Sequence, residues 1–119
     1  MAPQLAGLHH IKIPVTDLDQ SLRWYQDVLG AQHLQQFDHH DDAGARYAVI
    51  LGIPGVGTTI ELRWAPRAAV AMRECDPITL AVDSVATLTG WVEHLDSLGA
   101  DHSGLLTGGA GTLLVIRTP

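Results

Sequence analysis

The chain contains little of what would assign a protein to an oxidising compartment or to a membrane. Cys75 is the one cysteine in 119 residues, so no internal disulfide can form and a reducing compartment fits. No run approaches the roughly 20 apolar residues of a membrane span, and the first residues lack the basic-then-apolar pattern of a signal peptide. We therefore expect a cytoplasmic protein with no membrane partner.

Basic residues are also scarce. Seven Lys and Arg stand against 13 Asp and Glu, which gives a net charge of −6, and no basic run is present. Because nucleic acids are bound through clustered positive charge, we expect no nucleic-acid partner. The 119 residues, 46% of them hydrophobic, suffice for one compact domain and are too few for two of ordinary size.

The first half of the chain has the pattern of a strand, a helix and three more strands. Residues 8–15 alternate between apolar and polar positions, which predicts a strand with two unlike faces. Thr16 or Asp17 can cap a helix over 17–29, and Gly30 stands where helices commonly end. The DHHDDAG stretch is predicted to be a turn. Three further strands are expected, at 32–39, 47–51 and 58–64.

The second half repeats the start of this pattern. Residues 77–82 alternate again, Asp83 or Ser84 can cap a helix over 85–98, and the tripeptide LGA ends both predicted helices. Strands are expected near 105–106 and over 111–117, whereas no fourth strand follows. The repeat predicts an α+β fold of two tandem βαβββ modules. Its parts are a first module at 1–65, a connector at 66–76 and a second module at 77–119 that is incomplete at its C-terminus.

The stretch HHIKIPVTDLDQSLRWYQDVLGAQ resembles the opening of proteins of the glyoxalase / bleomycin resistance / extradiol dioxygenase (vicinal oxygen chelate) superfamily. The shared features are a histidine before a hydrophobic strand, a capped helix with an aromatic pair, and LG. The resemblance covers nearly the whole chain. It implies two modules that curve into one mixed-sheet cup with the helices on its convex side, and a homodimer. It also implies that a closing strand follows endings such as RTP, so the second module is expected to be truncated.

The resemblance implies a divalent metal in the cup, held by first-strand and last-strand residues of both modules. On this sequence the corresponding positions in the first module are His10 and Glu61, which are chemically able to bind nickel, zinc, manganese or iron. Glu61 would also move a proton in a reaction. Pro77 stands at the position equivalent to His10 and has no donor side chain. The alternative is therefore a cup that holds no metal.

Other side chains are expected in the cup on the alternation of the strands. If Ile60 and Leu62 face the core, Glu61 projects into the cup, where a carboxylate needs either a metal or an ion pair with Lys12 or Arg63. Lys12 and Arg63 together favour an anionic or carbonyl-bearing ligand. Further residues are expected to contact the ligand: Tyr47, Trp64 and Thr79. Asp38 to Asp42 look like a metal site by composition but are interpreted as a solvated turn.

Two classes of function follow from these residues. The first is a metal-dependent lyase or isomerase of the glyoxalase I kind, in which the ion polarises substrate oxygens. Ring-cleaving dioxygenase chemistry is less expected, because its iron site needs a histidine where Pro77 stands. The second is a metal-free protein that sequesters a ligand, as antibiotic-resistance members of the family do, or an accessory binding protein without catalysis.

Overall fold

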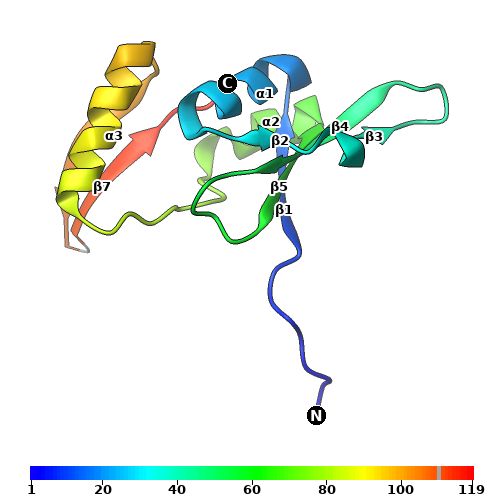
Figure 1. Ribbon diagram of the computed structural model, residues 1–119, viewed down its shortest axis with the longest axis horizontal. Helices are drawn as coiled ribbons and strands as arrows, with labels where there is room; N and C mark the ends of the chain where they lie inside the picture. Colours follow the sequence, from blue (N-terminus) through cyan, green and yellow to red (C-terminus); the bar gives the residue numbers. More distant parts are fainter. Residues whose placement is uncertain (110) are drawn as a thin grey trace.

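The computed structural model describes residues 1–109 and 111–119 and contains a five-stranded and a two-stranded sheet (Figure 1). The five-stranded sheet and its helix form the first unit, made of β1 (His10–Val15), α1 (Leu18–Leu29), β2 (Gln32–His33), β3 (His39–His40), β4 (Arg46–Gly52) and β5 (Thr59–Trp64). A 3-10 turn, η1 (Gln35–Phe37), separates β2 from β3. The second unit consists of α3 (Val85–Leu98), β6 (His102–Gly108) and β7 (Gly111–Ile116). The α+β fold class predicted from the sequence is confirmed.

The first unit has the strand order β1-β5-β4-β2, with β3 also paired to β4. β1 runs parallel to β5, and the other pairs are antiparallel. Because β2 and β3 both lie beside β4, they act as one strand interrupted by η1. The predicted order of strand, helix and three strands is therefore present in this unit.

Helix α1 begins and ends where the sequence predicts. The Asp17 carboxylate accepts a hydrogen bond from the backbone N–H of Gln20 at 3.0 Å, and Gly30 ends the helix with a φ of 66°. Glycine adopts this left-handed conformation without the steric cost that a Cβ would add. The apolar stripe of the helix lies on one sheet face, and its buried members include Leu18, Leu22, Tyr25 and Val28.

The hydrophobic core lies between α1 and this sheet. Alternate residues of the two central strands point at the helix and are almost fully buried: Val49 and Leu51 from β4, Ile60 and Leu62 from β5. Burying such a side chain contributes about 1.5–3 kcal/mol, so this cluster supplies most of the hydrophobic stabilisation of the unit. The strand residues between them face the opposite way, and these residues form the candidate site.

The strand predicted over 77–82 is absent, so the prediction that the second unit begins with a strand is wrong. Ile78 packs against the core of the first unit, whereas Leu80 and Val82 are exposed. In the first unit β1 gains its hydrogen bonds from the parallel strand β5. No strand of 1–109 or 111–119 takes that position in the second unit, so 77–82 has no partner for its backbone groups. The alternation of residues 77–82 therefore predicted a strand, but in the structure this segment has no neighbouring strand to pair with.

The rest of the second unit follows the predicted pattern. Ser84 caps α3 by accepting from the N–H of Thr87, and Gly99 ends it with a φ of 65°. The helix packs on the β6–β7 hairpin and buries Leu95 completely. A hydrogen bond of 2.9 Å joins the His94 ring to the Val28 carbonyl of α1, so the two units are connected through their helices.

The connector expected at 66–76 contains a short helix, α2 (Pro66–Ala71), followed by the 3-10 turn η2 (Met72–Glu74). Residues 1–9 form no helix or strand, and the first of them extend away from the sheet (Figure 1). No helix in the described part of the chain is long and apolar enough to cross a membrane.

The buried Tyr25 predicts how stability falls at alkaline pH. Burial raises the pKa of its phenol to about 12, above the value near 10 of an exposed tyrosine. Between these two values the unfolded chain loses the proton that the folded chain keeps, so the free energy of unfolding decreases as pH rises, by about 3 kcal/mol in all. Urea unfolding across this pH range should show the decrease in the wild type, and Tyr25→Phe should remove it. An equal decrease in both proteins would contradict this assignment.

Candidate functional site

The parallel register of β1 and β5 places two predicted site residues beside each other. His10 lies opposite Thr59 and Lys12 lies opposite Glu61. Paired residues of neighbouring strands project to the same side of a sheet. Ile60 and Leu62 point at α1, so Glu61, which lies between them, projects from the opposite face of the sheet together with Lys12. We call this opposite face the cup face, defined by His10, Lys12, Glu61 and Arg63.

Glu61 is the most buried residue of the cup face, with its side chain 2% exposed. Its Oε2 accepts a hydrogen bond from Nε of Arg63 at 2.8 Å. Its Oε1 lies 3.4 Å from Nε2 of His39 and 3.8 Å from Nε2 of His10. These three partners are far more exposed than the carboxylate, at 37%, 39% and 30% of their side chains. The carboxylate is therefore buried beneath three more exposed side chains whose nitrogens approach its oxygens.

Glu61 was expected to need either a metal or an ion pair, and in the structure it forms an ion pair with Arg63. The sequence allowed Lys12 or Arg63 as the cation, and the structure gives the ion pair to Arg63. The guanidinium carbon of Arg63 lies 5.1 Å from the centre of the Tyr47 ring, a cation–π distance. Tyr47 in turn packs against the His39 ring at 5.8 Å. The carboxylate and the aromatic ring thus fix the guanidinium from two sides.

His39 is a site residue that the sequence analysis missed. It was placed at the end of the strand predicted over 32–39, where the DHHDDAG turn was expected to begin, and it was assigned no role in the site. The turn begins only at Asp41, whose carboxylate accepts from the backbone N–H groups of Ala43 and Ala45. His39 belongs to β3 and pairs with Ala48 of β4, which brings its ring to Glu61. In the structure η1 interrupts the strand predicted over 32–39, and His39 begins the separate strand β3, so the predicted alternation did not indicate where its ring points.

Asp38 has a structural role in the same stretch. Its almost fully buried carboxylate lies 2.7 Å from Nε2 of His33 and 3.3 Å from Nη1 of Arg46. His33 belongs to β2 and Arg46 to β4, so the Asp38 carboxylate links these two strands just before β3 begins. Its oxygens are therefore already paired within the protein. The interpretation of Asp38 to Asp42 as a solvated turn is therefore wrong for Asp38, which is buried, and for His39 and His40, which form β3.

The structure does not bring the remaining predicted ligand contacts to the cup face. Trp64 pairs with the buried Val15, lies one residue after Arg63 and so projects to the opposite side, where it is exposed. Thr79 lies in the exposed segment that has no strand. Their roles in ligand binding remain predictions, whereas His10, Lys12, Tyr47 and Arg63 all surround Glu61.

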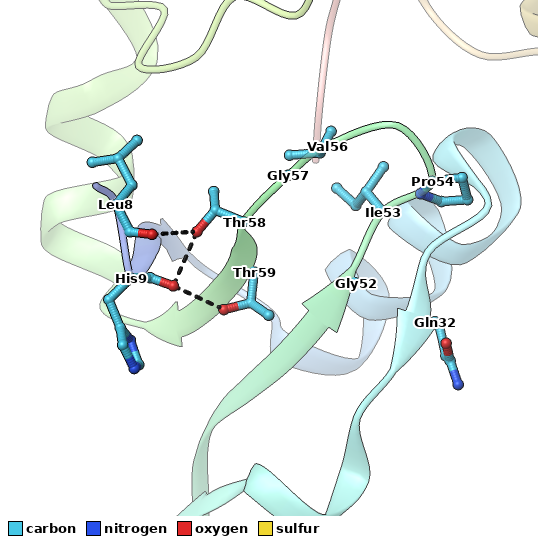
Figure 2. A pocket seen from close by; sticks show the side chains of 10 residues that line it. All are labelled: Leu8, His9, Gln32, Gly52, Ile53, Pro54, Val56, Gly57, Thr58 and Thr59. Atoms are coloured by element: carbon cyan, nitrogen blue, oxygen red, sulfur yellow. Dashed lines mark hydrogen bonds between the residues drawn. The ribbon is translucent and has the colours of Figure 1, made fainter. Parts of the chain in front are cut away.

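A hollow of about 520 Å³ lies at the end of the sheet next to this site (Figure 2). The Thr58 hydroxyl donates to the backbone carbonyl of His9 at 2.9 Å, and the Thr59 hydroxyl is 3.5 Å from the same oxygen. These bonds hold the start of β1 against β5. The ring of His9 contacts Nδ1 of His10 through its own Nδ1 at 2.8 Å. The hollow itself is lined by His9 and by the β4–β5 loop, and Glu61 lies outside it.

A divalent metal does not fit these residues as they are arranged. The described residues contain no group of three or more His, Cys, Asp or Glu side chains able to hold an ion. Oε2 of Glu61 is occupied by the Arg63 cation, which would also repel a second cation. Pro77, at the expected third position, lies in the segment without a strand and offers no donor. Only the convergence of His10 and His39 on Oε1 favours a metal.

The comparison with protein families decides the classification. A model of the glyoxalase/bleomycin resistance protein/dioxygenase superfamily matches residues 7–119. The chain belongs to this superfamily. A comparison with curated protein sequences gives no match.

Several solved structures share the fold. A glyoxylase/bleomycin resistance protein/dioxygenase domain from Frankia sp. EAN1pec is 26% identical with a TM-score of 0.71, over 97% of this chain and 85% of that one. TnmS3, an antibiotic-binding protein from Streptomyces sp. CB03234, is 19% identical with a TM-score of 0.73, over 99% and 91%. The fosfomycin resistance protein FosX from Listeria monocytogenes, in complex with Mn(II) and sulfate, is 19% identical with a TM-score of 0.60, over 84% and 77%.

The burial of Glu61 predicts unequal effects of removing the two partners of its ion pair. Arg63→Met leaves an uncompensated carboxylate inside the protein and should lower the free energy of unfolding by about 3 kcal/mol. Glu61→Gln leaves a half-exposed arginine that water can solvate and should cost about 1 kcal/mol. Urea unfolding measures both values.

Arg117→Met is the matched control, because the pair of Arg117 with Asp101 is exposed on both sides. An exposed pair contributes less than about 1 kcal/mol. Equal losses for Arg63→Met and Arg117→Met would show that Glu61 is not held as a buried charge.

Proposed function

We propose that this protein binds a small organic molecule on the cup face, with Glu61 and the groups around it as the polar anchors. The observation that carries the proposal is a buried carboxylate surrounded by three half-exposed nitrogen groups on one sheet face. Even when it is paired, a carboxylate buried at this depth stabilises a protein no more than apolar side chains of similar volume would, so its presence among apolar strands suggests a role beyond stability. Binding a polar ligand is such a role.

The superfamily supports ligand binding without chemistry as the first form of this function. TnmS3, which covers nearly the whole chain in the structural comparison, is described as an antibiotic-binding protein. In such a protein the cup holds its ligand, and the side chains around it supply contacts only. The ion pair between Arg63 and Glu61 supports this form, because it satisfies the carboxylate without a metal. His10, Lys12, Tyr47 and Arg63 are the proposed ligand contacts on the cup face.

A metal-assisted enzyme is the second candidate, and one observation favours it. Nε2 of His10 and Nε2 of His39 both approach the same oxygen of Glu61. The other ring nitrogen of His10 is held by His9, as the second nitrogen of a metal-binding histidine usually is. In this form His10 and Glu61 would hold a nickel, zinc, manganese or iron ion, which polarises substrate oxygens when it is bound. Glu61 would accept the proton that an isomerase or lyase moves.

Elemental mass spectrometry on freshly purified protein distinguishes the two forms. Because Arg63 already neutralises Glu61, we expect much less than one transition-metal ion per chain. If the wild type contains one ion per chain and both His10→Ala and Glu61→Ala lose it, the metal-assisted enzyme is favoured over metal-free ligand binding. His40→Ala is the control, since His40 is the exposed neighbour of His39 on the same strand.

We also propose that the protein forms a homodimer in the cytoplasm. Leu106 and Leu113 lie directly opposite each other in the β6–β7 ladder, and both are exposed. A second copy would cover this apolar pair.

Sedimentation at micromolar concentration should give the mass of two chains, and Leu113→Glu should shift it to one. Leu5→Glu in the extended N-terminal segment should have no effect, because Leu5 packs on nothing. A wild-type mass of one chain would contradict the homodimer.

A further inference from the structure

We propose that the ligand carries a carboxylate group and that Arg63 is the residue that recognises it. This inference rests on the proposed function, since it names the class of molecule that the cup face binds. Nε of Arg63 donates to Glu61, and the guanidinium carbon lies over the Tyr47 ring, 5.1 Å from its centre. Its two terminal nitrogens have no hydrogen-bond partner anywhere in 1–109 or 111–119. The donors of this side chain are therefore fixed in place and unused.

A fixed guanidinium with free terminal N–H groups is suited to two neighbouring oxygens of one group. A carboxylate presents two oxygens in one plane at the spacing of the guanidinium donors, so the pair forms two parallel hydrogen bonds. The contacts with Glu61 and Tyr47 have already removed rotamer freedom from the arginine. Binding therefore costs less side-chain entropy than binding to a mobile surface arginine would.

The charge around Arg63 also favours an anion, although the whole chain carries −6. Glu61 is the one carboxylate of the cup face, and it is buried beneath its partners. Lys12 lies opposite Glu61 in the neighbouring strand and is exposed. An approaching ligand thus meets the guanidinium, the ammonium of Lys12 and the rings of His10 and His39 before it meets the negative charge.

Tyr47 indicates the rest of the ligand. Its ring lies between Arg63 and His39 and presents an aromatic surface beside the free donors. A small carboxylic acid with a planar or apolar body would place its carboxylate on Arg63 and its body against this ring. Such ligands include aromatic acids and 2-oxo acids.

The experiment compares charged and neutral probes of the same shape on the full chain by two-dimensional NMR titration. Benzoate and pyruvate are the anionic probes, benzamide and pyruvamide their neutral counterparts, and benzylamine the cationic probe. We expect both anions to shift resonances of Tyr47, Glu61 and Arg63, and to bind at least about tenfold more tightly than the amides, a difference of about 1.4 kcal/mol. This part uses wild-type protein only, so it does not depend on the folding of a variant.

Variants then assign the effect to the guanidinium. Arg63→Lys keeps the charge and removes the planar pair of donors, so it should weaken benzoate binding at least about fivefold, whereas Arg117→Lys should leave it unchanged. Equal affinity for benzoate and benzamide, or unchanged benzoate binding in a folded Arg63→Lys, would overturn the inference.

The outcomes also separate this inference from the proposed function. If benzylamine or the amides bind the cup face and the anions do not, the proposed function stands and the carboxylate inference is wrong. If none of the five probes shifts the cup-face resonances, the carboxylate inference is overturned. If, in addition, a broader library of neutral and cationic molecules gives no shift there, the proposed function fails as well.

Discussion

The parallel pairing of β1 with β5 is the constraint on which the rest of the first unit depends. It closes the sheet on one side of β5, so that α1 covers a continuous apolar face. The same pairing sets His10 and Lys12 level with Thr59 and Glu61, which no sequence-local contact could do. A shift of one residue in this pairing would turn one strand over relative to the other, so that either the apolar residues of β1 would leave the core or Glu61 would enter it. Fold and site therefore share a single register.

The second unit shows what happens where this pairing is missing. Residues 77–82 have the alternation of β1 and a proline at the first position, but no described strand lies parallel to them. Their apolar side chains then have no helix-facing surface to join, and Leu80 and Val82 remain exposed. The unit keeps its helix and hairpin because those elements obtain their hydrogen bonds locally. Long-range pairing, rather than propensity, decides which part of the repeat becomes a strand.

The burial of Glu61 explains the chemistry of the cup face. A buried carboxylate requires a cation, and Arg63 supplies it from two residues further along the same strand. Tyr47 contacts the same guanidinium, and the two terminal nitrogens have no hydrogen-bond partner in 1–109 or 111–119. Arg63, which compensates the buried charge of Glu61, is therefore also the residue proposed to bind an anion. One side chain thus contributes both to stability and to the proposed ligand binding.

Much of the fold was predictable from local patterns. The helices over Leu18–Leu29 and Val85–Leu98 have caps, stripes and terminal glycines that are readable in the sequence, and their observed ends agree with those signals. The alternation around Glu61 correctly indicated its side of the sheet. The place of His39 in the site could not be predicted, because η1 interrupts the strand expected over 32–39 and the register shifts between His39 and His40. Nor could the sequence choose Arg63 over Lys12 as the partner of Glu61, since the choice depends on side-chain geometry rather than on spacing.

Hydrogen exchange of the arginine side chains, measured by NMR on the Nε–H groups, tests the central claim most directly. If Arg63 donates to a buried Glu61, its Nε–H should exchange with water much more slowly than those of the exposed Arg23 and Arg67. Glu61→Gln should remove most of this protection and leave the other arginines unchanged. Exchange of Arg63 as fast as that of Arg23 and Arg67 would mean that the ion pair does not hold the guanidinium. The cup face would then lack the prepared donors on which the account depends.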